Sequence, residues 1–366
     1  MQNTIYDLSM NECCDLIEHV GATRTVEVCG ALGSGKTQGI RAEMQRRFPD
    51  HIYIEFDCTN KDIQDLSVPK FMKALEDHIS DYVEFVPNAE LGVHLGKPII
   101  LNFDEMGKGS PTLKKGTRRV YHERAVNGLN LPEGSIVYMT SNLGSEGLGD
   151  GMPAHQRNTI IRVRMRKPNA EEWIDWGMNN DIDPAVLGWV REFPQVLQSY
   201  EDVDDPSDNE YIHDPRVQRD GVCTARTLHM VSDTLKVRDR LTSTTLTAAM
   251  IGTIGMRGAL DLQAFVAMAD QLPTLQSIKD DPKNARVPDS ASAVCLVVYR
   301  ALSMIERDWF GAWCKYMERL GAEAQALFIM NATKTGYKNQ AWIMNQPQFG
   351  QWCLSHGHLV RRTDDV

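Results

Sequence analysis

The chain has 366 residues, of which 42% are hydrophobic, so it is long enough for two or three domains with cores of their own. Its formal net charge of −10 excludes general attraction to DNA or to an anionic membrane, although a local basic patch is compatible with that total. No apolar run reaches the length of a membrane span, and the eight cysteines lack a zinc-like spacing, so we expect a soluble, cytoplasmic protein with free and mostly buried thiols.

Strand and helix patterns alternate over residues 1–167. The first helix is expected over 8–21, where Ser9 and Glu12 have the spacing of a capping box. Further helices are expected over 36–48 and 69–85. This alternation predicts a parallel sheet with helices on both faces. The expected strands are 23–30, 51–58, 97–106, 135–142 and 159–165.

From Pro168 onward the pattern is helical. A proline- and aspartate-rich stretch at 280–290 is typical of a linker, and the residues beyond it are again helical. We therefore expect three domains: an α/β domain over 1–167, a helical domain over 168–275 and a helical extension over 276–366. The helices expected before the linker are 169–180, 183–193, 224–239, 243–255 and 257–272.

A glycine-rich stretch, GALGSGKTQ, joins the strand at 23–30 to the helix at 36–48. It matches the phosphate-binding loop pattern Gly-x4-Gly-Lys-Thr in full, between a strand and a helix as that pattern requires. Glycines let backbone N–H groups turn inward to phosphate oxygens, and the helix N-terminus adds partial positive charge. We expect Lys36 to reach the β- and γ-phosphates and Thr37 to ligate Mg²⁺. The expected nucleotide contacts are Gly30, Ala31, Gly33, Ser34, Gly35, Lys36, Thr37 and Gln38.

Polar residues end two of the later strands. Asp104 and Glu105 follow the apolar run IILNF, and Asn142 ends the strand IVYMTSN. With the glycine loop upstream, we expect Asp104 to hold the metal and Glu105 to orient and polarise the attacking water. Asn142 is expected to contact both the γ-phosphate and that water. The alternatives are a strand end that meets solvent for the two acids, and a capping or turn asparagine for Asn142.

The loop, the acidic strand and the asparagine strand, in this order, resemble the AAA+ ATPases. Within that family the chain is similar to the MoxR-like branch, and in particular to its phage and prophage members. The similarity lies in KDIQDLSVP, although Ser67 stands where the branch usually has glycine, and in NLPEGSIVYMTSN, MPAHQRNTIIRVRM and TARTLHMVSD. It covers roughly residues 1–275 and implies a nucleotide-binding α/β domain followed by a helical lid.

The resemblance implies two catalytic arginines besides Lys36, Glu105 and Asn142. Arg157 matches the arginine finger that enters the neighbouring subunit's site, with Arg162 and Arg164 as alternatives. Arg226 matches the lid arginine that contacts the γ-phosphate. From the residues alone, a surface arginine and an arginine in the first turn of a helix remain the other interpretations.

The resemblance also implies an oligomer, in this family usually a ring of six, that hydrolyses ATP with Mg²⁺ to remodel or assemble a protein partner. A separate von Willebrand factor A-type protein is a partner to consider, because this chain contains no such domain. We find no aromatic pulling segment over 59–70, which favours local remodelling over threading.

The alternative is a nucleic-acid-dependent AAA+ ATPase, such as a loader or a recombination accessory. The basic stretch KKGTRR at 114–119 favours it. The net negative charge and the lack of a helix-turn-helix or β-hairpin DNA-binding module argue against it. A non-hydrolysing switch is a third interpretation, against which Glu105 argues, and GTP in place of ATP stays open.

Overall fold

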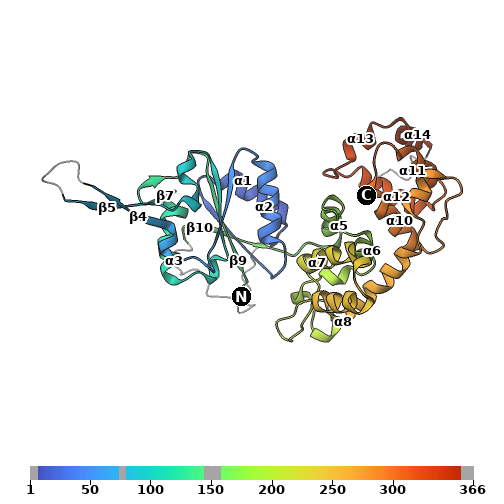
Figure 1. Cartoon of the computed structure of the whole chain (residues 1–366), viewed down its shortest axis with the longest axis horizontal. Coiled ribbons are helices and arrows are strands. Elements are labelled where there is room, and N and C mark those ends of the chain that lie inside the picture. The colour runs from blue at the N-terminus through green and yellow to red at the C-terminus, as the bar shows by residue number, and fades with distance from the viewer. Residues whose placement is uncertain (1–6, 74–79, 144–157, 356–366) are drawn as a thin grey trace. The chain divides into compact units, whose positions relative to one another are not determined.

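A computed structural model describes residues 7–73, 80–143 and 158–355. The chain divides into two compact units, residues 1–167 and 168–366, and each is described here by itself (Figure 1). All eight cysteines are free thiols, and most are buried as expected. Among the described residues, no helix has the length and apolar character that crossing a membrane requires.

The first unit is built on a six-stranded sheet in which every pair of neighbouring strands is parallel. The central strands are runs of apolar residues because both faces of the sheet are covered. The strand order is β1-β10-β2-β9-β6-β3. The strands are β1 (Asp7–Leu8), β2 (Thr25–Gly30), β3 (Ile52–Asp57), β6 (Ile99–Asp104), β9 (Ile136–Asn142) and β10 (Ile160–Met165).

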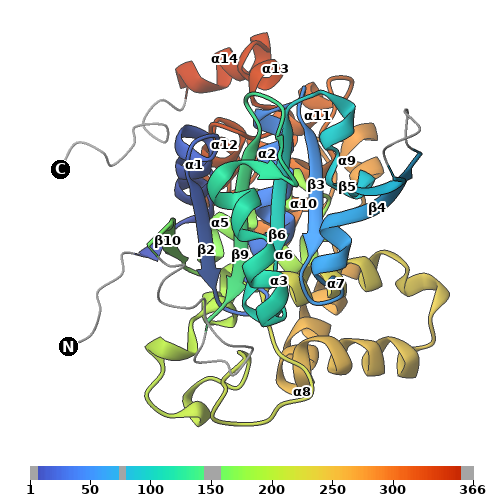
Figure 2. The ribbon, with the colours of Figure 1, turned by 90° about the vertical axis from the view of Figure 1, so that its left-hand side faces the viewer.

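Helices cover both faces of this sheet, as the sequence predicts (Figure 2). On one face, α1 (Met10–Val20) and α2 (Lys36–Arg47) pack their apolar side chains against β2, β6 and β9. The predicted capping box is present, because Ser9 and Glu12 bond each other's backbone N–H groups at the start of α1. The other face packs against α3 (Pro111–Gly116) and the helical turn Arg119–Glu123, which a short hairpin of β7 (Ala125–Val126) and β8 (Leu129–Asn130) follows.

The helix predicted over 69–85 is wrong. The structure has an antiparallel hairpin there, formed by β4 (Ser67–Met72) and β5 (Tyr82–Pro87), and it projects from the α/β unit (Figure 1). Both segments are rich in β-branched and aromatic residues, which favour strands over helices. The structure thus contains a projecting β-hairpin that the sequence analysis did not predict, while the absence of a DNA-binding module stays a prediction.

In its described part the second unit consists of helices and loops with one isolated β-bridge between Ile212 and Cys223. Its core is one continuous cluster that runs from Trp173 to Trp352. Residues on both sides of position 275 contribute to that cluster, and the division into lid and extension stays a prediction. The helices are α5 (Ala170–Asn179), α6 (Pro184–Glu192), α7 (Ala225–Lys236), α8 (Ser243–Asp270), α9 (Leu275–Asp280), α10 (Ala291–Met304), α11 (Phe310–Met317), α12 (Ala322–Ala332), α13 (Gln340–Met344) and α14 (Pro347–Ser355).

Helix α8 is broken at Gly255, where the predicted helices 243–255 and 257–272 meet. Gly255 has φ 79° and ψ 167°, a conformation that only glycine adopts readily. A Cβ atom on Gly221 would lie 2.5 Å from the Gly255 nitrogen, so two glycines allow the backbones to cross closely here.

Candidate functional site

The glycine loop lies between the end of β2 at Gly30 and the start of α2 at Lys36. Gly33 and Gly35 have φ values of 67° and 92°, which strain any other residue type. A Cβ atom on Gly30 would come within 2.8 Å of the Met165 carbonyl oxygen. Gly35 caps α2 without a side-chain hydrogen bond, so no capping side chain satisfies the first N–H groups of the helix. Such groups are suited to bind an anion.

The loop side chains fold inward. Lys36 is buried, and its Nζ donates to the carbonyl oxygens of Gly30 at 2.7 Å and Ala31 at 2.8 Å. Ser34 is also buried, and its hydroxyl has no hydrogen-bond partner within the described residues. Buried polar groups are normally satisfied, so an unpartnered hydroxyl in a glycine cradle fits a phosphate ligand. Gln38 is exposed in the first turn of α2.

The loop meets the acidic strand at Asp104. The Thr37 hydroxyl donates to Asp104 Oδ1 at 3.1 Å, although β9 lies between β2 and β6 in the sheet. The Thr140 hydroxyl, on β9, donates to the same oxygen. A hydroxyl and a carboxylate side by side are oxygen ligands of the kind that Mg²⁺ prefers. Thr37 and Asp104, which the sequence predicts as metal ligands, therefore lie together.

Glu105 follows directly and adopts a left-handed conformation with φ 53°. Asn142 Nδ2 lies 3.1 Å from both carboxylate oxygens of Glu105, so the two residues predicted to handle the attacking water are in contact. Lys108 forms an ion pair with the same carboxylate. The loop, the acidic pair and the asparagine thus gather at the carboxyl ends of β2, β6 and β9.

Four further polar residues at this edge were not predicted: Thr140 and Lys108, described above, and Glu55 and Asp57. Asp57 ends β3 in register with Asp104, and Glu55 stands two residues before it. Burial, and then the charge of Asp104, raise the pKa of Glu55. Burial alone would also raise the pKa of Asp57, but hydrogen bonds from Thr59 and Asn60 and the charge of Lys108 outweigh it and lower that pKa.

A sequence signal exists for some of these residues. Thr140 stands two positions before Asn142, and residues two apart on a strand share a face. Lys108 stands three positions after Glu105, but its contact depends on the tight turn that follows β6, which the apolar pattern does not predict.

The structure describes three of the four predicted arginines. Arg157 lies outside the described residues. Arg226 is an exposed residue in the first turn of α7, in the second unit. On β10, Arg162 pairs with the buried Glu27 at 3.4 Å and Arg164 pairs with Asp7 at 3.2 Å, so both alternatives are engaged within their own sheet.

Comparison with known proteins gives limited similarity, and no protein-family model matches the chain. An "ATP-dependent protease ATP-binding subunit-like protein" of Rhodococcus erythropolis is 25% identical over 201 residues, which cover 51% of this chain and 57% of that protein. The chain thus spans a little over half the length of this relative.

Two solved structures are similar at low scores. A candidate ATPase from Cytophaga hutchinsonii has a TM-score of 0.33 and 9% identity, over 80% of this chain and 74% of that one. NtrX from Brucella abortus has a TM-score of 0.35 and 14% identity, over 97% and 68% of the two chains. TM-scores this low do not establish a shared fold, so the fold of this chain is assigned from its own sheet and glycine loop. By these features the chain has a parallel α/β sheet with a phosphate-binding loop, the fold of a P-loop NTPase, followed by a helical C-terminal part.

Proposed function

We propose that the chain is an AAA+ ATPase that binds ATP with Mg²⁺ at the carboxyl edge of the sheet and hydrolyses it. The observation that carries the proposal is the 3.1 Å contact between Thr37 and Asp104, which joins the glycine loop to the acidic strand. The name of the Rhodococcus relative, an ATP-binding subunit-like protein, supports ATP as the nucleotide.

Each residue has a role in this proposal. Backbone N–H groups from Gly33 to Thr37 bind the phosphates, with Ala31 and Gln38 at the border of the loop. Lys36 exchanges its bonds to two loop carbonyls for phosphate oxygens. Thr37 and Asp104 hold Mg²⁺, which offsets the charge of the phosphate oxygens.

Hydrolysis would use the pair at the end of β6 and β9. Glu105 accepts the proton of the attacking water, since a carboxylate in reach of that water is a suitable general base. Asn142 contacts the γ-phosphate and the water through its amide. Its present bonds to Glu105 place the amide beside that carboxylate.

The finer proposal is a homo-oligomer, a ring of six, in which Arg157 enters the neighbouring site and Arg226 contacts the γ-phosphate from the lid. An arginine finger raises the rate by on the order of a thousandfold or more. The pairing of Arg162 with buried Glu27 and of Arg164 with Asp7 favours Arg157 for this role over either of them.

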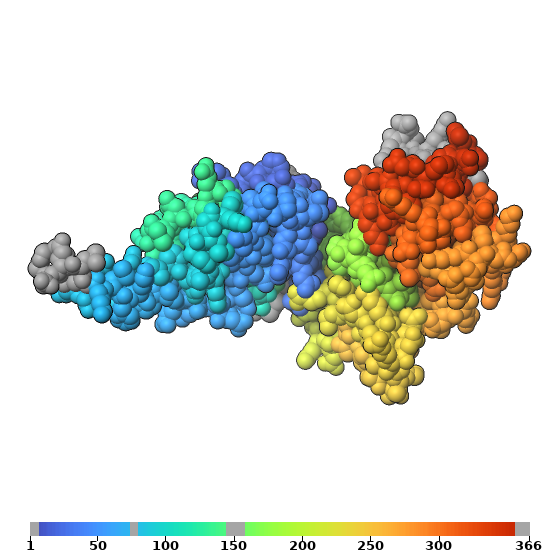
Figure 3. All heavy atoms as spheres, turned by 45° about the horizontal axis from the view of Figure 1, so that its top comes forward, coloured from blue at the N-terminus to red at the C-terminus, as the bar shows by residue number. Residues whose placement is uncertain are grey.

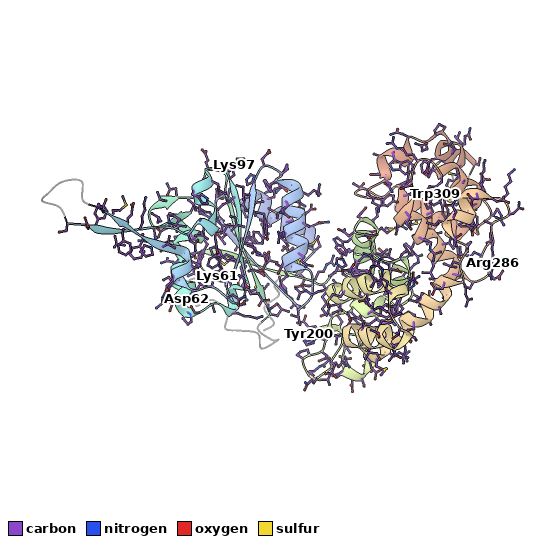
Figure 4. All side chains as sticks on the ribbon, viewed as in Figure 1. Lys61, Asp62, Lys97, Tyr200, Arg286 and Trp309 are labelled. Carbon is purple, nitrogen blue, oxygen red and sulfur yellow. The ribbon has the colours of Figure 1, made fainter. Side chains whose placement is uncertain are left out.

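The β4–β5 hairpin supports a protein partner, which the MoxR-like assignment implies. Its base is fixed: Asp62, labelled in Figure 4, caps the turn Ile63–Leu66 before β4 and accepts a hydrogen bond from Ser110 at 3.2 Å. Beyond this base it forms an arm on the surface of the α/β unit (Figure 3).

The arm exposes apolar side chains. In the hairpin register Phe71 faces Val83 and Pro69 faces Phe85, so these four residues share one face. Phe71 is 83% exposed and Phe85 is 58% exposed. Exposed apolar patches of this kind are typical of surfaces that bind other proteins. A separate von Willebrand factor A-type adaptor, or the remodelled protein itself, would meet this surface.

The nucleic-acid-dependent alternative has less support. In the basic stretch 114–119, Lys114 is buried and donates to the Gly107 carbonyl, and Arg119 lies 3.8 Å from Glu123. The hairpin face that carries Phe71 and Phe85 is apolar, and on the opposite face, which is also exposed, Lys70 stands across from Glu84, so neither face is basic. A DNA-dependent ATPase would be stimulated by single- or double-stranded DNA and would lose that stimulation steeply with salt.

Nucleotide binding and turnover by the purified full chain test the proposal, with Lys36→Ala as the central variant. We expect Mg²⁺-dependent ATP hydrolysis by the wild type, and loss of both nucleotide affinity and turnover in Lys36→Ala. Lys97→Ala, at a surface position labelled in Figure 4, is the matched control and should leave both unchanged. Unchanged affinity and turnover in Lys36→Ala would contradict the proposal, and competition between ATP and GTP identifies the base preference.

A further inference from the structure

We propose that Lys108 is a positioning residue for the proposed ATPase reaction: its ammonium group holds the Glu105 carboxylate in place beside the nucleotide site. This inference rests on the function proposed above. It concerns a residue that carries no part of the nucleotide-binding pattern.

The turn after β6 fixes where Lys108 stands. Residues Met106–Lys108 form a single helical turn, and the Lys108 backbone N–H donates to the Glu105 carbonyl oxygen at 2.9 Å. The left-handed backbone of Glu105 begins this turn, and for a residue other than glycine it costs about 1 kcal/mol or more. The turn returns the chain so that the Lys108 side chain reaches the Glu105 carboxylate.

Two groups from different elements hold this carboxylate. Asn142 approaches from β9, with its Nδ2 at 3.1 Å from both oxygens, and Lys108 approaches from the turn. The proposed reaction requires the Asn142 amide at the γ-phosphate as well. When that amide turns to the phosphate, Lys108 is the remaining described group that fixes Glu105.

The charges at this edge give Lys108 a second effect. Four carboxylates lie near the carboxyl ends of the neighbouring strands β3 and β6: Glu55, Asp57, Asp104 and Glu105. A triphosphate would add more negative charge and repel Glu105. Lys108 keeps the Glu105 carboxylate in place against this repulsion. Without Lys108 the partly exposed carboxylate turns away from the phosphates, so the loss falls on kcat and not on ATP affinity.

A purely structural role for the ion pair predicts a different outcome. The side chains of Lys108 and Glu105 are 35% and 28% exposed, and a pair of this kind contributes about 0–1 kcal/mol to stability. In that case its loss would shift the melting temperature slightly and would leave kcat unchanged. A positioning role instead changes kcat and leaves nucleotide affinity unchanged, because Lys108 acts on the general base and not on the loop.

The test compares Lys108→Met, Lys108→Arg and the wild type in the full chain, with ATP as substrate. We expect kcat of Lys108→Met to fall about 10- to 100-fold, since small misplacements of a catalytic group cost about that much. The Kd for ATP should stay within about twofold. Lys108→Arg, which keeps the charge, should recover most of kcat. Lys115→Met, an exposed lysine on α3, removes the same charge nearby and should leave kcat unchanged.

Thermal unfolding of each variant shows whether it is folded at the assay temperature, and Lys108→Gln replaces Lys108→Met if that variant is not. An unchanged kcat in the charge-free variants, or equal losses in the methionine and arginine variants, would overturn the inference while wild-type turnover still supports the proposed ATPase. Absence of turnover in the wild type would overturn both.

Discussion

The carboxyl edge of the sheet and the β4–β5 hairpin belong to the same α/β unit, yet their side chains are arranged in opposite ways. At the edge, the polar groups of Lys36, Asp104 and Glu105 all have partners within the chain. On the hairpin, Phe71 and Phe85 are largely exposed. Charged groups that neutral polar groups of the chain hold in place are suited to fix a nucleotide, and exposed apolar groups are suited to bind a protein. The two proposed functions therefore rest on separate elements and should be separable by mutation.

The largest effect is expected at Glu105. Glu105→Gln keeps the shape of the side chain and its place beside Asn142, but an amide cannot accept the proton of the attacking water. We expect kcat to fall by on the order of a thousandfold while ATP still binds. Single-turnover hydrolysis and equilibrium binding of ATP measure the two quantities. Glu133→Gln, at an exposed position, is the control, and near-normal turnover in Glu105→Gln would exclude Glu105 as the general base.

A smaller effect is expected at Gly30, where the loop leaves β2. In Gly30→Ala the new methyl group would meet the Met165 carbonyl oxygen at 2.8 Å and the Lys36 side chain at 3.2 Å. The loop must shift, so we expect ATP affinity to weaken about tenfold, which corresponds to about 1.4 kcal/mol. Gly252→Ala, where no atom lies within 4 Å of the new methyl group, should leave affinity unchanged. Equal affinities in both variants would show that the loop is not held rigidly.

The helix that carries the loop offers a pH-dependent test of the scaffold. Hydrogen bonds from Arg46, opposed by burial and supported by Arg47, lower the pKa of Glu43 from 4.5 to about 2. A carboxyl group with a lowered pKa in the folded state stabilises the protein above its unfolded pKa and loses that effect as pH falls toward the folded value. Glu43→Gln should therefore lower the free energy of unfolding at pH 7 by about 1 kcal/mol.

Urea unfolding at several pH values checks this expectation. The difference between Glu43→Gln and the wild type should shrink as pH falls from about 4.5 to about 2. Asp50→Asn, at an exposed position just beyond the same helix, should show no comparable difference. A difference that is constant over this pH range would mean that the charge of Glu43 does not stabilise the fold.

Much of the first unit could be predicted because its signals are local. The capping box of Ser9 and Glu12, the glycines before Lys36 and the apolar strands each specify their own structure over a few residues. The convergence of Thr37 and Asp104 could also be inferred, since carboxyl ends of parallel strands meet at one edge of a sheet.

The features that escaped prediction depend on contacts between segments. The runs SVPKFM and YVEFVP are short, and an apolar run of that length fits a helix or a strand until its partner is known. The contact of Lys108 with Glu105 depends on a tight turn that begins with a left-handed glutamate, a conformation that residue types other than glycine adopt only in context. The partners of Arg162 and Arg164 likewise depend on the strand order.

The smallest effect on the fold is expected at the hairpin, and this prediction separates the two regions most clearly. Replacing both Phe71 and Phe85 with serine removes exposed side chains, so we expect the free energy of unfolding to change by about 0.5 kcal/mol or less. Basal ATP hydrolysis should stay within about twofold of the wild type, because neither residue contacts the loop or the acidic strand. Any increase in turnover that a protein partner causes should be lost.

Thermal unfolding, steady-state ATPase assays and the same assays with added von Willebrand factor A-type protein measure these three quantities. Met330→Ser with Met344→Ser removes exposed apolar side chains from the helical unit and serves as the control. If the hairpin variant loses basal turnover while it remains folded, the hairpin and the site are coupled, and the separation of nucleotide chemistry from partner binding is wrong. If it keeps both basal turnover and the response to a partner, the exposed apolar face serves neither function.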